Sequence, residues 1–273
     1  MLIFESQSKD VYRNLAIEEY LMDQMTDAGP ILFLWQSDCA VVMGKNQNPW
    51  RECRLDLMKK DGVPLARRIS GGGTVYHDVG NLNYCVIVER TEYKEEMAYQ
   101  MIFHALDNFG IRAEKTGKSN LSVDGRKFSG NAFSFRKGRA LHHGTLLLNT
   151  DLDRLNRYLG SLFDHIDTHA ISSVPADVMN LNLDTTELSA TLKESFRSLY
   201  GRNGPSPDVH FELDEMALMP LEDRQVSDNW KYGATPRFSL EVNGLQMEVV
   251  KGMVVDAENK AKPFVDFADS LLC

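Results

Sequence analysis

The sequence predicts an α+β protein built around a mixed β-sheet. Segments with the apolar runs of strands and segments with the apolar spacing of helices are both present. They do not alternate regularly along the chain, which disfavours a doubly wound parallel sheet. The composition, 43% hydrophobic and 25% charged residues, is typical of a globular protein and excludes disordered, collagen-like and coiled-coil classes.

Helices are expected where apolar residues recur every three or four positions. The first, residues 12–25, carries Leu15 and Ile17 in such a pattern and is closed by Gly29 and Pro30. A shorter helix is expected within residues 215–230, although Pro220 interrupts its pattern. The remaining helices are expected at residues 51–60, 93–109, 151–159 and 186–199.

Strands are expected at residues 31–36, 40–43, 64–69, 83–88, 119–123, 126–134, 140–148, 238–242 and 247–255. The dipeptides Asp124-Gly125 and Lys137-Gly138 are suited to tight turns between three of these strands. The Gly- and Pro-rich stretch 201–208 is expected to be a loop or linker.

The charge balance disfavours a general nucleic-acid-binding protein. Lys and Arg total 30 and Asp and Glu total 39, so the net charge is −9. The four cysteines lack the spacing of a zinc site, and we expect reduced thiols. The chain shows neither a signal peptide nor an apolar run long enough for a membrane span, so a cytoplasmic location is expected.

The most unusual segment is Arg67–Asp78, RRISGGGTVYHD. The run Gly71–Gly73 allows backbone amides to approach a ligand closely, and Arg67 and Arg68 can pair with a carboxylate or phosphate. Together with the nearby His77, these residues indicate an anion or nucleotide site. The alternative is a flexible turn flanked by solvated arginines.

A lysine follows the first of the two turns. If its strand is half-buried, Lys127 and Ser129 share one face, and the small Ser129, Gly130 and Ala132 leave room for the ammonium to reach a bound anion. The alternative is an ordinary lysine at a strand edge, with its head group in water.

Two histidines occur together at His142 and His143. Adjacent residues of a strand point to opposite faces, so at most one of them faces a given site, which disfavours a shared metal ion. For either one, a hydrogen-bonded histidine in the core is the alternative.

One phosphate-binding motif is rejected. Thr116–Ser119 ends like a P-loop, but Arg112 stands where that motif needs its first glycine. The residues that follow predict a strand and a turn rather than the required helix.

Taken in order, RRISGGGTVYHDVGNLNY, DGRKFSGNAF and HHGTLLLNTDLDRL make the chain resemble the lipoate–protein ligase family, and GKNQNPW fits the same family. The resemblance implies a mixed-sheet fold of the biotin and lipoate ligase type. It implies a catalytic domain at residues 1–230 and a short accessory domain at residues 231–273.

The resemblance also implies a two-step reaction. The carboxylate of lipoate attacks ATP, which is bound with Mg²⁺, and forms lipoyl-adenylate. A lysine of an acceptor domain then takes the lipoyl group. The implied acceptors are the lipoyl domains of 2-oxoacid dehydrogenase complexes or the H protein of glycine cleavage, with no nucleic acid or membrane as partner.

Roles for single residues follow from the same resemblance. Lys127 is the implied catalytic residue, and Val75, Val86 and Leu146 are candidates for lining the lipoyl tunnel. No resident metal ligands are implied. Roles in binding substrate and nucleotide are implied for Arg68, Ser70, Gly71, Gly72, Gly73, His77, Asn81, Ser129, Gly130 and His143.

The chain departs from the family pattern in three ways, one of which is the short accessory domain. Asn120 replaces an acidic residue, and Pro175 and Asp177 replace two arginines. Two alternatives therefore stay open: a lipoyltransferase that uses preformed lipoyl-adenylate, and a lipoyl-binding protein without catalysis. Acyl transfer through a cysteine is disfavoured, because none occurs between Cys85 and Cys273.

A docking site for an acidic acceptor domain is one hypothesis for the hairpin that carries Arg136, Lys137 and Arg139. A solvated hairpin tip is the alternative.

Overall fold

The computed structural model describes residues 1–24, 29–201, 211–242, 244–255 and 261–271. The chain divides into two compact units, and each is described by itself. The first unit contains residues 1–38, 77–152 and 175–221. The second contains residues 39–76, 153–174 and 222–273.

The first unit is built on a seven-stranded sheet in the order β1-β2-β6-β10-β9-β8-β7. β1 runs parallel to β2, whereas the other pairs are antiparallel, so the predicted α+β fold with a mixed sheet is confirmed. The strands are β1 (Leu2–Glu5), β2 (Ile31–Trp35), β6 (Asn81–Glu89), β7 (Glu114–Thr116), β8 (Asn120–Val123), β9 (Arg126–Arg136) and β10 (Arg139–Leu147).

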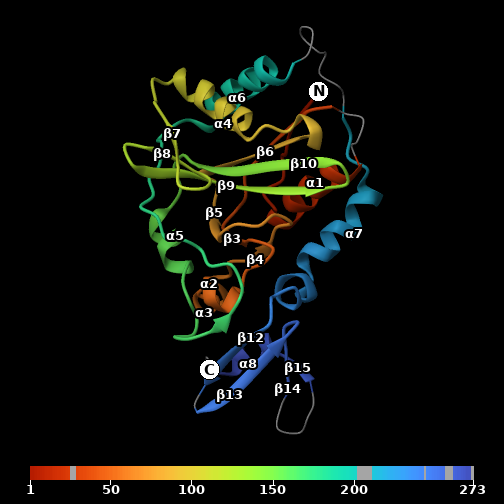
Figure 1. The fold of residues 1–273 in the computed structure, drawn as a ribbon, viewed down its shortest axis with the longest axis vertical. Helices are drawn as coiled ribbons and strands as arrows, with labels where there is room; N and C mark the ends of the chain where they lie inside the picture. Colours follow the sequence, from red (N-terminus) through yellow and green to blue (C-terminus); the bar gives the residue numbers. More distant parts are fainter. Residues whose placement is uncertain (25–28, 202–210, 243, 256–260, 272–273) are drawn as a thin grey trace. The chain divides into compact units, whose positions relative to one another are not determined.

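Helices cover both faces of this sheet (Figure 1). α4 (Glu95–Asp107) and α6 (Thr185–Tyr200) lie on one face, where their buried side chains join those of the central strands in one apolar core. α1 (Val11–Gln24) covers the other face. The Asp184 side chain caps α6 by accepting the N–H groups of Thr186 and Glu187.

The two predicted turns join β8 to β9 and β9 to β10. Their residues all have positive φ: 50° at Asp124, 78° at Gly125, 48° at Lys137 and 72° at Gly138. This is the conformation of a type I′ turn, whose twist matches that of antiparallel strands. The turn at Asp124-Gly125 therefore determines where β9, and with it Lys127, begins.

The second unit contains two smaller sheets, a three-stranded one in the order β4-β3-β5 and a five-stranded one in the order β11-β12-β13-β14-β15. Trp50 lies in the apolar core of the larger sheet, with its ring against those of Phe238 and Phe264. The strands are β3 (Ala40–Met43), β4 (Leu65–Arg67), β5 (Val75–His77), β11 (Asp167–Thr168), β12 (Phe238–Val242), β13 (Leu245–Val250), β14 (Met253–Val255) and β15 (Ala261–Pro263).

The remaining helical elements are α2 (Pro49–Glu52), α3 (Leu55–Asp61), the turn η1 (Arg90–Glu92), α5 (Leu152–Tyr158), α7 (Glu215–Val226), the π-helical turn η2 (Asn229–Gly233) and α8 (Phe264–Leu271). Pro220 lies inside α7 rather than ending it. No described helix is long and apolar enough to cross a membrane.

Two predicted elements are divided. The helix expected at residues 51–60 breaks between α2 and α3, because Cys53 forms a bridge with Leu159 and the N–H of Arg54 donates to the carbonyl of Tyr158. The strand expected at 247–255 is a hairpin of β13 and β14, turned at Lys251 with φ 51°.

Several short elements were not predicted, namely β1, β5, β7, β11, β15 and α8. Parts of two predictions lie outside the described residues: the closure of the first helix before Gly29, and most of the linker at 201–208.

Candidate functional site

The glycine run of the second unit is held in place by Arg68, which is only 6% exposed. One terminal nitrogen of its guanidinium, Nη2, donates to the carbonyls of Gly71 at 2.6 Å and Gly73 at 2.7 Å. Its Nε donates to Ser70 Oγ at 3.0 Å. Arg68 thus orders the loop that follows it.

The backbone of this loop requires glycine at specific points. Gly72 has φ +82°, a conformation that side chains disfavour. A Cβ on Gly44 would lie 2.3 Å from the carbonyl oxygen of Gly72, so the two backbones pack directly on each other. Among the described residues, no acceptor pairs with the backbone N–H groups of Gly71, Gly72 and Gly73. Successive N–H groups of this kind suit an anion.

Arg67, the other arginine before the glycine run, serves the fold. Its guanidinium is wholly buried and donates to carbonyls of the second unit, among them those of Lys45 at 2.9 Å and Lys231 at 2.6 Å. It also donates to Thr235 Oγ1 at 2.9 Å. Burial lowers the pKa of Arg67 to about 10. Of the two arginines that could pair with an anion, Arg67 is thus occupied by backbone carbonyls of the fold.

His77 is the last residue of β5 and the only residue of that strand assigned to the first unit, and Asn81 begins β6 of the same unit. The ring of His77 meets that of Trp35 edge to face, with 5.4 Å between centroids. Asn81 donates to Asn83 Oδ1 at 3.1 Å, whereas its buried Oδ1 has no partner in the described part of the chain.

Lys127 stands at the start of β9, where a second segment fixes its backbone. Its N–H donates to the carbonyl of Asp177 at 2.8 Å, and its carbonyl accepts the N–H of Met179 at 2.9 Å. The half-buried side chain passes over Gly130, where a Cβ would lie 3.1 Å from Lys127 Nζ.

Phe128 points into the apolar core, as expected. The expectation that Lys127 and Ser129 share one face is wrong, because a bulge in the pairing of β8 with β9 interrupts the alternation of side chains. Lys127 lies over Gly130, whereas Ser129 contacts Asn131.

Ser129 belongs to a buried polar network between β6, β9 and β10. Its Oγ accepts Nδ2 of Asn131 at 3.2 Å, and Oδ1 of Asn131 accepts the hydroxyl of Tyr84 and lies 3.1 Å from His142 Nε2. Burial lowers the pKa of His142 to about 3, so its ring is neutral near pH 7.

His143 lies on the other face of β10. Its Nδ1 is 2.6 Å from Glu18 Oε2, and Oε1 of the same carboxylate accepts Nε1 of Trp35 at 3.0 Å. The two histidines therefore face opposite sides of the sheet, as predicted. Glu18 was missed by sequence reasoning, because on α1 it appears as one more charged residue of an amphipathic helix.

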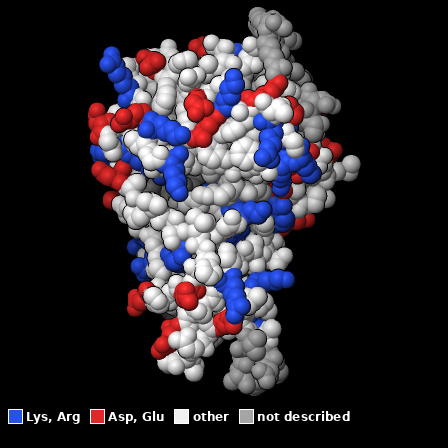
Figure 2. Space-filling view, viewed as in Figure 1, with Lys and Arg blue, Asp and Glu red and all other residues white. Residues whose placement is uncertain are grey.

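The structure gives less support to two further hypotheses, the lining of a lipoyl tunnel and the docking of an acceptor at the basic hairpin. Val86 and Leu146 lie in the core with α4 and α6, not on the face of His143. Arg139 is 1% exposed and pairs with Glu89 at 3.1 Å, so it does not belong to an exposed docking patch. On the face in Figure 2, basic and acidic side chains are interspersed.

The match with known proteins decides the family. The model of the lipoyl protein ligase A/B catalytic domain matches residues 10–197. The chain belongs to the lipoate–protein ligase family. A curated relative from Bdellovibrio bacteriovorus, named lipoate-protein ligase A, is 39% identical over 250 residues, which cover 87% of this chain and 73% of the relative.

Solved structures of lipoate–protein ligases share the fold. P. falciparum LipL1 in complex with lipoate has a TM-score of 0.74 at 28% identity and covers 99% of this chain and 88% of its own. A lipoate-protein ligase A bound with ATP has a TM-score of 0.70 at 26% identity, and the match covers 84% of this chain and 96% of the other. A bi-partite lipoate protein ligase of Thermoplasma acidophilum, studied with its E2 lipoyl domain, has a TM-score of 0.71 at 24% identity. The match covers 89% of this chain and 98% of the other.

These matches confirm the family and the ligase class expected from the motifs. Among the described residues of this ligase, no group of three or more His, Cys, Asp and Glu side chains could hold a metal ion.

Proposed function

We propose that this chain is an ATP-dependent lipoate–protein ligase, which activates lipoate as lipoyl-adenylate and transfers it to a lysine of an acceptor protein. The observation that carries the proposal is the ordered glycine loop. Arg68 draws the carbonyls of Gly71 and Gly73 toward itself, and the N–H groups of Gly71–Gly73 have no acceptor among the described residues. Such a loop suits a phosphate.

In the first step, a carboxylate oxygen of lipoate attacks the α-phosphorus of Mg-ATP, and pyrophosphate leaves. Two anions must approach each other, so fixed positive charge and N–H dipoles lower the barrier. We assign the phosphate to the glycine loop with Arg68 and Ser70. The ammonium of Lys127 is assigned to the oxygens between the acyl group and the phosphate.

In the second step, the ε-amine of the acceptor lysine attacks the acyl carbon. An amide forms, AMP leaves, and the amine gives up a proton. Lys127 stabilises the charge that develops on the acyl oxygen. His77, Asn81, Ser129, Gly130 and His143 are proposed to bind or orient the substrates.

The proposed partners are lipoyl acceptor domains, those of 2-oxoacid dehydrogenase complexes or the H protein of glycine cleavage. A cytoplasmic location remains a prediction from the sequence.

We also propose that residues 231–273 are a short accessory domain beside a catalytic domain of residues 1–230. The strands β12–β15 and helix α8 support this division, since they share an apolar core. That core also includes Trp50, and the compact unit containing this segment also includes residues 39–76.

A second candidate, transfer of preformed lipoyl-adenylate only, is favoured by one observation. The residue that supplies the backbone acceptor for Lys127 is Asp177, a carboxylate where the family pattern has an arginine. Its side chain lies 3.4 Å from Arg126, and one positive charge of that region is thereby compensated.

The test combines two measurements on the purified protein. With lipoate and Mg-ATP we expect pyrophosphate release, and with an added lipoyl domain we expect the acceptor's mass to increase by one lipoyl group. Transfer from supplied lipoyl-adenylate, without pyrophosphate release from ATP, would favour the second candidate. Binding of lipoate without either reaction would contradict both.

A further inference from the structure

Gln47 occupies the centre of a polar network in the loop between β3 and α2, and its side chain is wholly buried. The oxygen Oε1 accepts two hydrogen bonds, from the N–H of Gly44 at 2.8 Å and from Thr74 Oγ1 at 2.8 Å. Gly44 packs against the glycine loop, and Thr74 directly follows it. The acceptor half of this amide thus holds the glycine loop.

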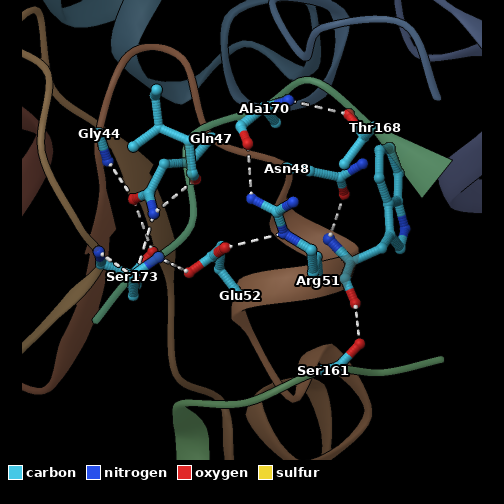
Figure 3. Close-up of polar contacts among 12 residues, drawn as sticks. Gly44, Gln47, Asn48, Arg51, Glu52, Ser161, Thr168, Ala170 and Ser173 are labelled. Atoms are coloured by element: carbon cyan, nitrogen blue, oxygen red, sulfur yellow. Dashed lines mark hydrogen bonds and ion pairs between the residues drawn. The ribbon is translucent and has the colours of Figure 1, made fainter. Parts of the chain in front are cut away.

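The donor half of the same amide holds a second segment. Nε2 donates to the carbonyl of Ile171 at 3.3 Å and to Ser173 Oγ at 3.1 Å. The amide orientation follows from its partners, because the backbone N–H of Gly44 only donates and the carbonyl of Ile171 only accepts. All four hydrogen-bonding positions of the Gln47 amide are therefore used, and Figure 3 shows it between Gly44 and Ser173.

The second segment, residues 170–173, is bound along its length. The N–H of Ser173 donates to Glu52 Oε2 at 3.0 Å, and the other oxygen of that carboxylate accepts Arg51 Nε at 3.0 Å. Arg51 Nη2 in turn donates to the carbonyl of Ala170 at 2.9 Å (Figure 3). Ser173 closes the network, since its Oγ also accepts the N–H of Thr74 at 2.9 Å.

We propose that Gln47 is a positioning residue of the ligase reaction. It fixes the glycine loop and residues 170–173 to each other, so that the loop's N–H groups hold their arrangement before the nucleotide arrives. The inference rests on the function proposed above. Donors that are already oriented need no reorganisation when phosphate charge moves, and this is why their support affects nucleotide binding and activation.

The two reaction steps can separate this role from a merely structural one. Gln47→Met keeps a side chain of similar length but removes all four hydrogen bonds. We expect the KM for ATP to rise about tenfold or more. The rate of transfer from saturating lipoyl-adenylate is expected to change less than about threefold, since a saturating ligand orders the loop itself.

Two substitutions, each of which removes one hydrogen bond of the Gln47 amide, test its donor half and its acceptor half separately. Ser173→Ala removes an acceptor of the donor half, and Thr74→Val removes a donor to the acceptor half. Each is expected to raise the KM for ATP about threefold or more, and the effect of either is expected to shrink when Gln47 is already Met. If Gln47→Met does not fold, these two variants carry the test.

The matched control is Tyr158→Phe. Tyr158 is a buried residue of the same unit, and its hydroxyl donates to Asp61 at 3.1 Å rather than to either segment. We expect this variant to lose stability without a change in the KM for ATP.

Variants at Gln47, Ser173 and Thr74 that lose stability but keep the wild-type KM for ATP would overturn the inference and leave the proposed function intact. A wild-type protein that releases no pyrophosphate would instead overturn the proposed function, and this inference with it.

Discussion

The side chain of Lys127 crosses directly over Gly130: a Cβ at that glycine would lie 3.1 Å from Nζ and 3.2 Å from Cε. The missing side chain therefore creates the space in which the ammonium sits. Gly130 is not among the residues with positive φ, so its backbone does not itself require glycine. The need for glycine comes from the lysine.

Gly130→Ala tests this relationship. The new methyl group meets the mobile end of a lysine rather than backbone, so the ammonium should shift while the fold is kept. Because a misplacement of about 1 Å can reduce catalysis about a hundredfold, we expect kcat for lipoyl transfer to fall between about tenfold and a hundredfold. Steady-state kinetics measure the fall in kcat, and a thermal melt shows whether the fold is kept. Ser134→Ala, on the same strand, is the control, and equal rates in the two variants would contradict the role of Gly130.

Arg68→Lys tests the support of the glycine loop. Lysine keeps the charge but lacks the fork that reaches Ser70 and the carbonyls of Gly71 and Gly73 together. We expect the KM for ATP to rise about tenfold, with a smaller change in the KM for lipoate. Isothermal titration with ATP and lipoate checks the split between the ligands. An equal loss of affinity for ATP and for lipoate would argue against a specific role of Arg68 at the phosphate.

Arg67→Met tests stability rather than chemistry. The wholly buried guanidinium satisfies several carbonyls, and the substitution leaves these acceptors without donors. We expect the free energy of unfolding to fall by about 3 kcal/mol. Urea denaturation at neutral pH measures it. A variant as stable as the wild type would show that Arg67 is dispensable to the fold.

His142 makes stability depend on pH in a defined window. Burial lowers its pKa in the folded protein from 6.5 to about 3, so only the unfolded chain takes up a proton between these values. Stability is therefore complete above about pH 6.5 and falls as the pH drops toward 3, by at most about 1.4 kcal/mol per pH unit.

The variant His142→Phe should flatten this dependence, because phenylalanine binds no proton. Urea denaturation between about pH 4 and about pH 6 compares the slopes with that of the wild type. The control His104→Asn removes an exposed histidine of α4 and should leave the slope unchanged. An unaltered slope in His142→Phe would assign the pH dependence to other groups.

Local signals explain what the sequence could predict of the fold. The hairpins around Asp124-Gly125 and Lys137-Gly138 follow from turn chemistry that acts over a few residues, and the structure has them where expected. The break between α2 and α3 could not be predicted, because it depends on Leu159, far along the chain. The short edge strands carry too few residues for a periodic pattern.

For the candidate site, motifs identified residues but not their partners. Arg67 and Arg68 are adjacent and chemically identical, yet one supports the glycine loop and the other supports distant carbonyls. The choice depends on which direction each side chain takes from β4, and only the tertiary structure determines it. Gln47 was missed for the same reason, since its partners include Thr74 and Ser173.

The alternation of His142 and His143 across β10 has a practical consequence for spectroscopy. One imidazole is packed among Tyr99 and Phe133, and its neighbour pairs with Glu18 on the other side of the sheet. Selectively labelled histidines would thus provide two adjacent reporters in different surroundings. A ligand bound on one side of the sheet should shift one ring signal strongly and leave the other close to its original position.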